Sequence, residues 1–572
     1  MQLGPGQGLI DDAKLRRLVE GRLLGLRVNR YSWWTHAREL ADYLLPRRYR
    51  WLVTPNMMAR GSPINQHIID STGTLAARNL ASGMMSGISS PTRPWFKLKV
   101  GRVDSTQTSP TSLWLAECER LMMLVFQESN FYNAIATVYF DLVVFGTAVV
   151  LMYEDFDDVI RCYNPAFGEY YVDMDGKFRP VVFYREFTLT VAQVVDEFGR
   201  DSVSESVGRL YDQGGSNLTR EIIVAHAIEP NDGKFGIAKH FAFREVYWEW
   251  GGTQSQQAAS GASGFLRKRG YHEQCAVIVR WDLVSNDAYG RSPAMDALGD
   301  VKQLQMETRR KAQAIDKMVN PPMVADIQLK NQPASLLPGG VTYVAGMKEG
   351  RAAFTPVYSV MPPVKDMMED LNEVRDRIKK IFFNDLFQTI SQYETRSNVS
   401  ATEIDARRAE SLVMLGPVLE RIENELLSPV IERTFAVMSR AGILPPAPSQ
   451  IAGANIDIEY VSMLATAQSA AATSGIERLL SLAGNLAGID PSVVDNIDID
   501  YALDKMSSLL NNDPKMIRSP EALAAIRQQR AQQQAQAQQA EMAEKMAAGA
   551  KTLSETDVGG GRNALQQMGI GQ

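Results

Sequence analysis

Hydrophobic positions recur with a helical period over several long segments of the chain. Leucines spaced along one helix face mark residues 11–45, and Pro46 ends that run. A second helical pattern covers 66–86 and stops near Gly87, and a third covers 111–145. The N-terminal part of the chain is therefore predicted to be mainly helical.

The pattern changes between about 147 and 282. Short runs rich in β-branched and aromatic residues alternate with turn residues such as Asn164-Pro165 and Asn231-Asp232-Gly233. The runs lie at 147–153, 180–188, 221–229, 239–249 and 275–282. This region is predicted to be an antiparallel β-containing domain with a flexible Gly/Ser/Gln-rich loop at 251–264, whose role stays open.

A strong helix start follows the β-rich region. Ser292 suits the N-cap and Pro293 the first helical position, and the helix is expected to continue until Asn320. At 1.5 Å per residue, a helix of about 27 residues is roughly 40 Å long. Its apolar face is interrupted by Gln305, so the helix is too polar in the middle to form a hydrophobic bundle within a single chain.

The second long helix begins near Pro363 and ends near Phe383. Its apolar residues are spaced three and four apart, which is a heptad seam. The seam consists of Val364, Met367, Leu371, Val374, Ile378 and Ile381. The first half of this helix is acidic and the second half basic, which complements the helix dipole. Periodicity alone allows either a helical hairpin inside one domain or helices that pack against other copies in a ring.

Further helices are predicted towards the C-terminus. The stretch 384–399 is polar and irregular, and the capping box at 400–403 opens a helix that runs to about Arg440. Bends are expected in this helix at Gly416-Pro417 and Pro429. Short helices are expected over 456–512, and an Ala/Gln-rich helix from Pro520 to about Ala548.

Composition excludes some classes of protein. Apolar residues make up 45% of the 572 residues, which rules out wholesale disorder. The net charge of −6 argues against a protein whose whole surface binds nucleic acid through its phosphates. Three widely spaced cysteines are typical of a reducing compartment. The apolar stretch 134–153 has Asp141 near its centre, so a buried helix feeding a strand is favoured over membrane insertion.

The sequence contains no catalytic motif that we recognise. It lacks a phosphate-binding Walker sequence, a zinc-protease motif, a nucleophile elbow and a Rossmann glycine fingerprint, and its five histidines do not cluster in sequence. The acidic run at 155–158 either holds a divalent cation or forms a solvated turn after a strand. The expectation is a protein that is not an enzyme and needs no cofactor.

Eight short segments, in the same order, resemble the portal proteins of short-tailed bacteriophages, also called head-to-tail connector proteins. They cover about residues 30–440 and comprise 69–73 (IDSTG), 84–87 (MMSG), 90–96 (SPTRPWF), 145–148 (FGTA), 289–294 (YGRSPA), 311–314 (KAQA), 320–322 (NPP) and 414–421 (MLGPVLER). The C-terminal part is similar only in character.

The resemblance implies an α+β, mainly helical portal fold whose copies form a ring of about twelve subunits at one capsid vertex. The expected regions are N-terminal helices and a β-rich wing at 1–291, a first stem helix at 292–320, a clip at 321–361, a second stem helix at 362–383, a channel loop at 384–399, a long kinked wing helix at 400–445, a helical crown at 446–550 and a flexible tail at 551–572.

The resemblance also assigns roles and partners. Double-stranded DNA would pass through the channel during packaging and ejection, touched weakly by a set of loop residues: Gln388, Gln392, Tyr393 and Arg396. The clip would dock the terminase packaging motor and later the tail or adaptor proteins, through Lys330, Lys348 and Arg351. Capsid and scaffolding proteins are the other expected partners, in the virion and in the host cytoplasm during assembly.

Two other functions stay open from the residues. An internal scaffolding or core protein of the virion would account for the Gln/Ala-rich C-terminal helix. A metal-dependent enzyme that processes nucleic acid would use the acidic run at 155–158.

Overall fold

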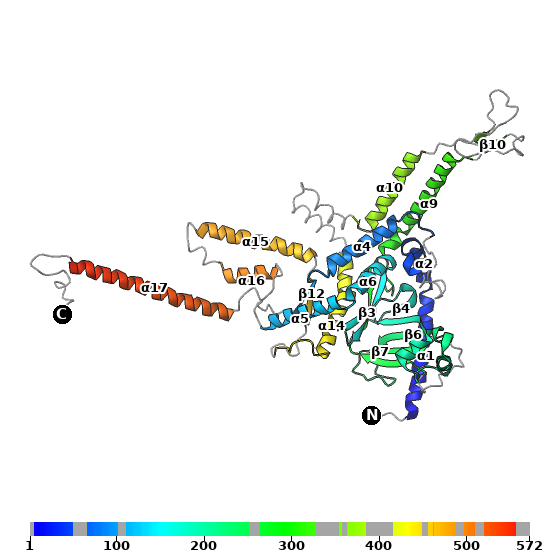
Figure 1. Ribbon diagram of the computed structural model, residues 1–572, viewed down its shortest axis with the longest axis horizontal. Coiled ribbons are helices and arrows are strands. Elements are labelled where there is room, and N and C mark those ends of the chain that lie inside the picture. Colours follow the sequence, from blue (N-terminus) through cyan, green and yellow to red (C-terminus); the bar gives the residue numbers. More distant parts are fainter. Residues whose placement is uncertain are drawn as a thin grey trace, which may run out of the picture. The chain divides into compact units, whose positions relative to one another are not determined.

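The fold is taken from a computed structural model, in which the chain divides into two compact units (Figure 1). The structure describes residues 5–49, 66–100, 110–250, 264–321, 323–325, 354–356, 363–384, 416–448, 456–460, 463–487, 497–509 and 520–555. Unit 1 contains 1–96, 121–444 and 460–467, and unit 2 contains 97–120, 445–459 and 468–572. The channel loop and most of the clip expected from the resemblance lie outside the described residues.

Unit 1 is built around two antiparallel sheets. The larger has the strand order β4-β5-β6-β7-β8, so it is a meander in which each strand pairs with its neighbour in sequence. Its strands are β4 (Tyr170–Asp173), β5 (Val182–Thr190), β6 (Glu221–Pro230), β7 (Phe243–Glu249) and β8 (Arg267–Tyr271). The smaller has the order β3-β2-β9, with β2 (Thr147–Asp155), β3 (Val159–Tyr163) and β9 (Ala276–Arg280). The predicted antiparallel β-rich region is confirmed, but β3, β4 and β8 are too short to have given a clear sequence pattern.

Helix α1 (Pro5–Asn29) lies along the larger sheet (Figure 1). Its leucine and valine face enters a core that includes Tyr184 and Trp248 of the sheet. The helix expected over 11–45 is in fact two helices, because α1 ends before Arg30 and a separate helix, α2 (Tyr31–Leu44), begins after it. The Arg30 side chain is fully buried and lies over the rings of Phe167 and Tyr171. This tertiary contact accounts for a break that the periodicity did not reveal.

Two helices between β5 and β6 were not predicted. Helix α7 (Val191–Phe198) starts with a capping box, in which Thr190 and Gln193 satisfy each other's backbone N–H groups. Helix α8 (Glu205–Gln213) follows, and the valines of both helices fill a second core against the sheet. Their shortness explains why a window of a dozen residues missed them.

The apolar stretch 134–153 is a buried helix, α6 (Phe131–Phe145), that feeds β2, as expected. The Asp141 carboxylate pairs with Arg48 of α3 (Pro46–Tyr49), whose Nε donates at 3.0 Å. Burial raises the pKa of Asp141 and the Arg48 guanidinium partly opposes that rise. Among the described residues, none of the helices is long and apolar enough to cross a membrane. The helix expected over 111–145 divides near Ser129 into α5 (Pro110–Glu128) and α6.

The C-terminal helix of unit 1 is irregular close to Pro429, one of the two positions where a bend was expected; the other, Gly416-Pro417, adjoins residues outside the described ranges. α13 (Gly416–Ile422) and α14 (Ser428–Arg440) are joined by a π-helical turn, Glu423–Leu427, which ends two residues before Pro429. Such a turn accommodates the backbone group that proline leaves without a partner. Glu425 in this turn accepts hydrogen bonds from the backbone N–H of Arg280, at 3.0 Å, and from its guanidinium.

Unit 2 contains a small sheet and several helices. Strand β1 (Phe96–Val100) pairs with β12 (Ile456–Tyr460), so the expectation of helices from residue 456 onward was wrong for 456–460. Helices α15 (Met463–Ala487), α16 (Ile499–Leu509) and α17 (Pro520–Glu555) follow. Helix α17 starts at Pro520 as predicted, and its described side chains are exposed apart from half-buried Leu523 and Ile526.

One carboxyl group in unit 2 sits in an unusual environment. Glu119 of α5 accepts the backbone N–H of Leu98 at 2.6 Å. Burial raises its pKa to about 7, against the opposing effects of that hydrogen bond and of Lys97.

Candidate functional site

The two long helices predicted from the sequence form an arm that projects from unit 1 (Figure 1). Helix α9 spans Pro293–Val319 and helix α10 spans Val364–Ile381. Ser292 is the N-cap of α9, and its Oγ accepts the backbone N–H of Met295 at 3.2 Å. The predicted start and end of α9 are thus confirmed.

The start of α9 is anchored to the junction between α6 and β2. The Ser292 hydroxyl donates to the carbonyl oxygen of Val144 at 2.8 Å, and Gly290 N–H donates to the Thr147 hydroxyl at 2.8 Å. Gly146, at φ +72°, approaches Gly290 so closely that a Cβ on either would lie within 2.4 Å of the other's carbonyl oxygen. Glycine is required at both positions because the two backbones touch.

Three polar side chains tie the base of the arm together. The Gln305 amide of α9 accepts the backbone N–H groups of Ile69 and Asp70, at 2.7 and 2.8 Å, and donates to the Asp70 carbonyl at 2.8 Å. The Asp70 carboxylate then accepts two hydrogen bonds from Arg375 of α10, at 3.0 and 2.7 Å. The segment before α4 (Thr72–Ile88) therefore clamps both helices of the arm.

The clamp sets the ionisation of its carboxyl group. Burial by itself would raise the pKa of Asp70, but the hydrogen bonds from Thr72 and the Arg375 guanidinium outweigh it. The pKa of Asp70 is consequently held below its ordinary value of 3.8.

Burial divides the arm into two parts. We call 293–305 and 371–381 the base, and 306–319 and 364–370 the distal half. The base buries several apolar side chains in unit 1, among them Ala294, Ala297, Leu298, Val301, Leu304, Leu371, Val374 and Ile378. No side chain of the distal half is buried in the described residues. Five large apolar side chains of the distal half are exposed: Met306, Ile315, Met318, Val319 and Met368.

The seam residues follow this division except for Ile381, which lies in the base but is half-buried. Leu371, Val374 and Ile378 are buried, whereas Val364, Met367 and Ile381 are half-buried. The heptad pattern therefore continues beyond the part of the helix that unit 1 covers.

The two distal helices carry opposite charge. In α9 the distal half has four basic and two acidic residues, the basic ones being Arg309, Arg310, Lys311 and Lys317. In α10 it has three acidic residues, Asp366, Glu369 and Asp370, against Lys365. Within the described part of the arm, no ion pair joins the two distal halves, although Arg377 pairs with Asp300 at 3.4 Å at the base. Among the described residues, the basic side chains of distal α9 therefore do not pair with the acidic side chains of distal α10 in the same copy.

The insertion between the helices begins and ends in a two-stranded antiparallel ladder. Strand β10 (Met323–Ala325) pairs with β11 (Phe354–Pro356), with Val324 opposite Thr355. The predicted docking residues Lys330, Lys348 and Arg351 lie outside the described residues. So do the predicted DNA-contacting residues Gln388, Gln392, Tyr393 and Arg396.

The acidic run at 155–158 forms the turn between β2 and β3. The Asp155 carboxylate accepts the backbone N–H groups of Asp157 and Asp158, at 2.8 and 3.1 Å. Those hydrogen bonds lower the pKa of Asp155. Over the part of the chain that the structure describes, no group of three or more His, Cys, Asp or Glu side chains is placed to hold a metal ion.

Sequence reasoning missed the clamp. Gln305 was noticed only as a polar interruption of an apolar face, and Asp70 and Arg375 were not singled out. A polar residue at a seam position was the available signal, because a buried amide needs hydrogen-bond partners from somewhere.

The chain matches known families and proteins over almost its whole length. Residues 16–517 match the family model described as bacteriophage head to tail connecting protein. The chain is 41% identical over 556 residues to the "Probable portal protein" of Bordetella phage BPP-1, covering 97% of this chain and 98% of that protein. It is 39% identical over 551 residues to the "Portal protein" of Salmonella phage epsilon15, covering 95% and 96%.

Proposed function

The chain belongs to the bacteriophage head-to-tail connecting proteins, the portal proteins, and from that premise we propose that its copies close into a ring of about twelve subunits. Its function is that of a portal protein, which joins head to tail and provides the channel through which DNA is packaged. The exposed distal half of the arm is the observation that carries the ring.

The exposed apolar side chains of the distal half support the proposed ring. It buries no side chain within the described residues, yet it exposes five large apolar ones. Isolated helices are marginal in water, so long helices normally draw their stability from packing. A neighbouring copy would supply that packing and cover the apolar side chains.

Charge supports one specific arrangement of neighbours. The basic distal part of α9 would face the acidic distal part of α10 in the next copy. This contact joins two different surfaces, so it is heterologous, and repeating it generates a ring when the rotation closes. We take α9 and α10 as the two stem helices around the channel.

The ring is tested by the mass of the purified protein in solution. Light scattering is expected to show one large closed assembly, and negative-stain images to show rings with a central hole. A monomer that persists at micromolar concentration would contradict the ring. Filaments without closed rings would favour an internal scaffolding protein instead.

The insertion at 321–361 is proposed as the clip that docks the packaging motor and later the tail. It connects the far ends of both arm helices, and β10 pairs with β11 where it leaves and rejoins them. Lys330, Lys348 and Arg351 are the proposed docking residues. Deleting 334–350 is expected to leave the rings assembled but the capsids unfilled, and capsids that fill normally would refute the assignment.

The segment 384–399 is proposed as the channel loop. It would touch DNA through few polar groups, namely Gln388, Gln392, Tyr393 and Arg396. Each neutralised phosphate adds a counterion-release contribution to binding, so few contacts let DNA slide. Removing 388–396 is expected to spare ring assembly but to impair retention of packaged DNA. Normal retention of full-length DNA in that variant would count against the loop.

The remaining regions complete the proposal. The β-rich part of unit 1 would be the wing, and the helices within 446–550 the crown towards the capsid interior. Terminase, tail or adaptor proteins, capsid protein and scaffolding protein are the proposed partners. The protein would act at the portal vertex of the virion after assembling in the host cytoplasm.

A further inference from the structure

The turn between β2 and β3 exposes an aromatic side chain completely. Phe156 is 109% exposed and is flanked by Asp155, Asp157 and Asp158. We call residues 155–158 the acidic tip. A fully exposed phenylalanine gains no burial from its own chain, so a partner's apolar pocket that covered the ring would remove that surface from water.

The acidic tip is held in one shape before any partner binds. The Asp155 carboxylate accepts the backbone N–H groups of Asp157 and Asp158, and β2 and β3 pair up to Asp155 and Val159. Val159 has a φ of +68°, which is strained for a β-branched residue. Strained backbone of this kind clusters at binding sites, where the surrounding structure maintains it.

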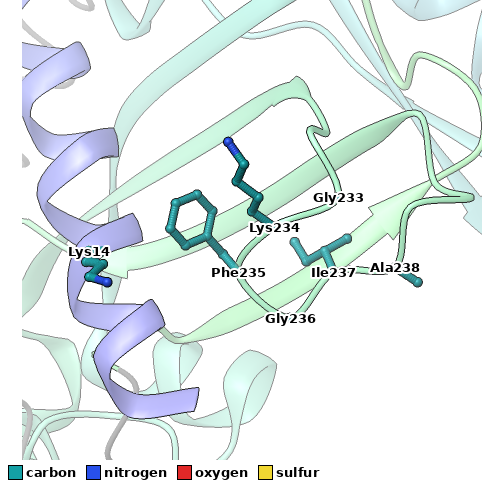
Figure 2. A pocket seen from close by; sticks show the side chains of 7 residues that line it. All are labelled: Lys14, Gly233, Lys234, Phe235, Gly236, Ile237 and Ala238. Atoms are coloured by element: carbon teal, nitrogen blue, oxygen red, sulfur yellow. The ribbon is translucent and has the colours of Figure 1, made fainter. Parts of the chain in front are cut away.

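A hollow of about 620 Å³ lies elsewhere on unit 1, between α1 and the loop that joins β6 to β7 (Figure 2). We call it the basic hollow. It is lined by Lys14 of α1 and by Gly233, Lys234, Phe235, Gly236, Ile237 and Ala238. In the view of Figure 2, the Phe235 ring lies between the side chains of the two lysines. The hollow therefore offers apolar surface beside two ammonium groups.

The lysines of the hollow have little to neutralise them. Lys14 makes no ion pair among the described residues, and the nearest carboxylate oxygen to Lys234 Nζ belongs to Asp232 at 3.6 Å. That carboxylate is already engaged by Arg244 at 2.9 Å. The hollow is thus positively charged on balance.

The hollow is also shaped in advance. The Asn231 side chain donates to the carbonyl oxygens of Ala238 and Phe241, at 2.9 and 3.0 Å, and accepts the backbone N–H of Gly233. The guanidinium of Arg244 lies over the Phe235 ring at 5.6 Å. A preformed site loses less conformational freedom when it binds.

We propose that the acidic tip of one copy inserts Phe156 into the basic hollow of the neighbouring copy in the ring. Phe156 would lie against Phe235 and Ile237, while Asp157 and Asp158 approach Lys14 and Lys234. This inference rests on the proposed ring and names a second contact between its subunits.

The two surfaces are formed by different elements of unit 1, the tip by the β2–β3 turn and the hollow by α1 and the β6–β7 loop. Next to the tip, Glu154 pairs with Arg440 of α14 at 2.8 Å, so the tip lies on the α14 side of unit 1. Helix α1 runs along the other side of the sheets (Figure 1). A protruding side chain and a hollow that belong to different surfaces of the same chain can make the head-to-tail contact that a ring requires.

Chemical crosslinking of full-length protein tests the contact. Cys118, Cys162 and Cys275 are buried, and burial raises the pKa of each thiol, so native cysteines react slowly. The variant with both Asp157→Cys and Lys234→Cys is treated with a short bismaleimide and run on a denaturing gel. A ladder of covalent multimers is expected, and each single-cysteine variant should remain monomeric on the gel.

The outcomes separate the contact from the ring. Rings of normal size without a ladder would overturn the tip-to-hollow contact and leave the portal function standing. If neither the double-cysteine variant nor the unsubstituted protein forms rings, and no ladder appears, both proposals are overturned. Dimers from a single-cysteine variant would mean that like surfaces meet, which also overturns the contact.

Side-chain substitutions give a second test. Phe156→Ala is expected to raise the protein concentration for half-maximal assembly about tenfold. Phe178→Ala is the matched control, because Phe178 is 63% exposed in another turn of positive φ and should not change assembly. Asp157→Lys and Lys234→Asp should each weaken assembly, and combining them should restore it. Equal effects of both phenylalanine variants, or no restoration, would contradict the contact.

Discussion

The base and the distal half of the arm are parts of the same two helices, but they depend on different partners. The base packs a row of apolar side chains into unit 1 and is clamped by Asp70, Gln305 and Arg375. The distal half continues the same helical period with no buried side chain among the described residues. The period of a helix therefore indicates that a face is apolar, but not which molecule covers it.

The comparison predicts the largest loss of stability for a seam residue of the base. Leu371 is 1% exposed, and Leu371→Ala is expected to lower the free energy of unfolding by about 2–5 kcal/mol, because it removes buried surface and leaves a cavity. Urea unfolding followed by tryptophan fluorescence, at a concentration below assembly, measures the loss. Met368→Ala, at a position 47% exposed in the same helix, is the control and should be nearly neutral.

A smaller loss is expected from the clamp. Asp70→Asn keeps an acceptor for Thr72 but removes the charge that Arg375 pairs with, and should cost roughly 1–2 kcal/mol at neutral pH. The lowered pKa of Asp70 means that its carboxylate stabilises the fold above its ordinary pKa. That contribution is lost as the pH falls through the folded-state value, which lies below 3.8.

The pH dependence distinguishes this clamp from general acid effects. The wild-type protein and Asp70→Asn should differ most near neutral pH and converge in acid. Asp366→Asn, which changes an exposed carboxylate of the same arm, is the control. A constant difference across the pH range would show that the charge of Asp70 is not what Arg375 requires.

Exposed charges at the edge of the base should matter less than the seam. Glu373 is 71% exposed in its side chain and lies 3.6 Å from Arg377, so Glu373→Gln is expected to change unfolding by about 0–1 kcal/mol. The comparison with Leu371→Ala, measured as melting temperatures of the assembled ring, tests whether apolar packing or charge holds the arm. Equal shifts would count against the seam.

The smallest effect on unfolding is expected in the distal half, where the effect on assembly should be largest. Arg310→Glu and Ile315→Ser should each change the free energy of unfolding of the unassembled chain by less than about 0.5 kcal/mol. Both should nevertheless weaken ring formation in sedimentation or light scattering. Adding Glu369→Lys to Arg310→Glu should recover part of the assembly if α9 faces α10 of the next copy. Unfolding losses as large as that of Leu371→Ala would erase the distinction between base and distal half.

Local signals in the sequence predicted the arm well. The N-cap at Ser292, the proline at 293 and the end at Asn320 all lie where they were expected, because each depends on residues within one turn of the helix. The same holds for the start of α17 at Pro520. Short elements such as α7, α8 and β3 were missed because a few residues do not establish a period.

Contacts between distant residues could not be predicted in the same way. Gln305 meets Asp70 across 235 residues, and Arg375 meets Asp70 across 305. The break at Arg30 likewise depends on Phe167 and Tyr171, which come from another part of the fold. Nothing in the local pattern identifies such partners.

The sequence by itself determined the family, the long helices and their apolar seam, because these follow from motif order, caps and periodicity. Only the tertiary structure decided where the seam stops being covered, which polar groups clamp the arm, that Phe156 is fully exposed, and that two lysines line a hollow. The physical reason is that burial and hydrogen-bond partnership are properties of positions in space, and folding brings those positions together from segments hundreds of residues apart.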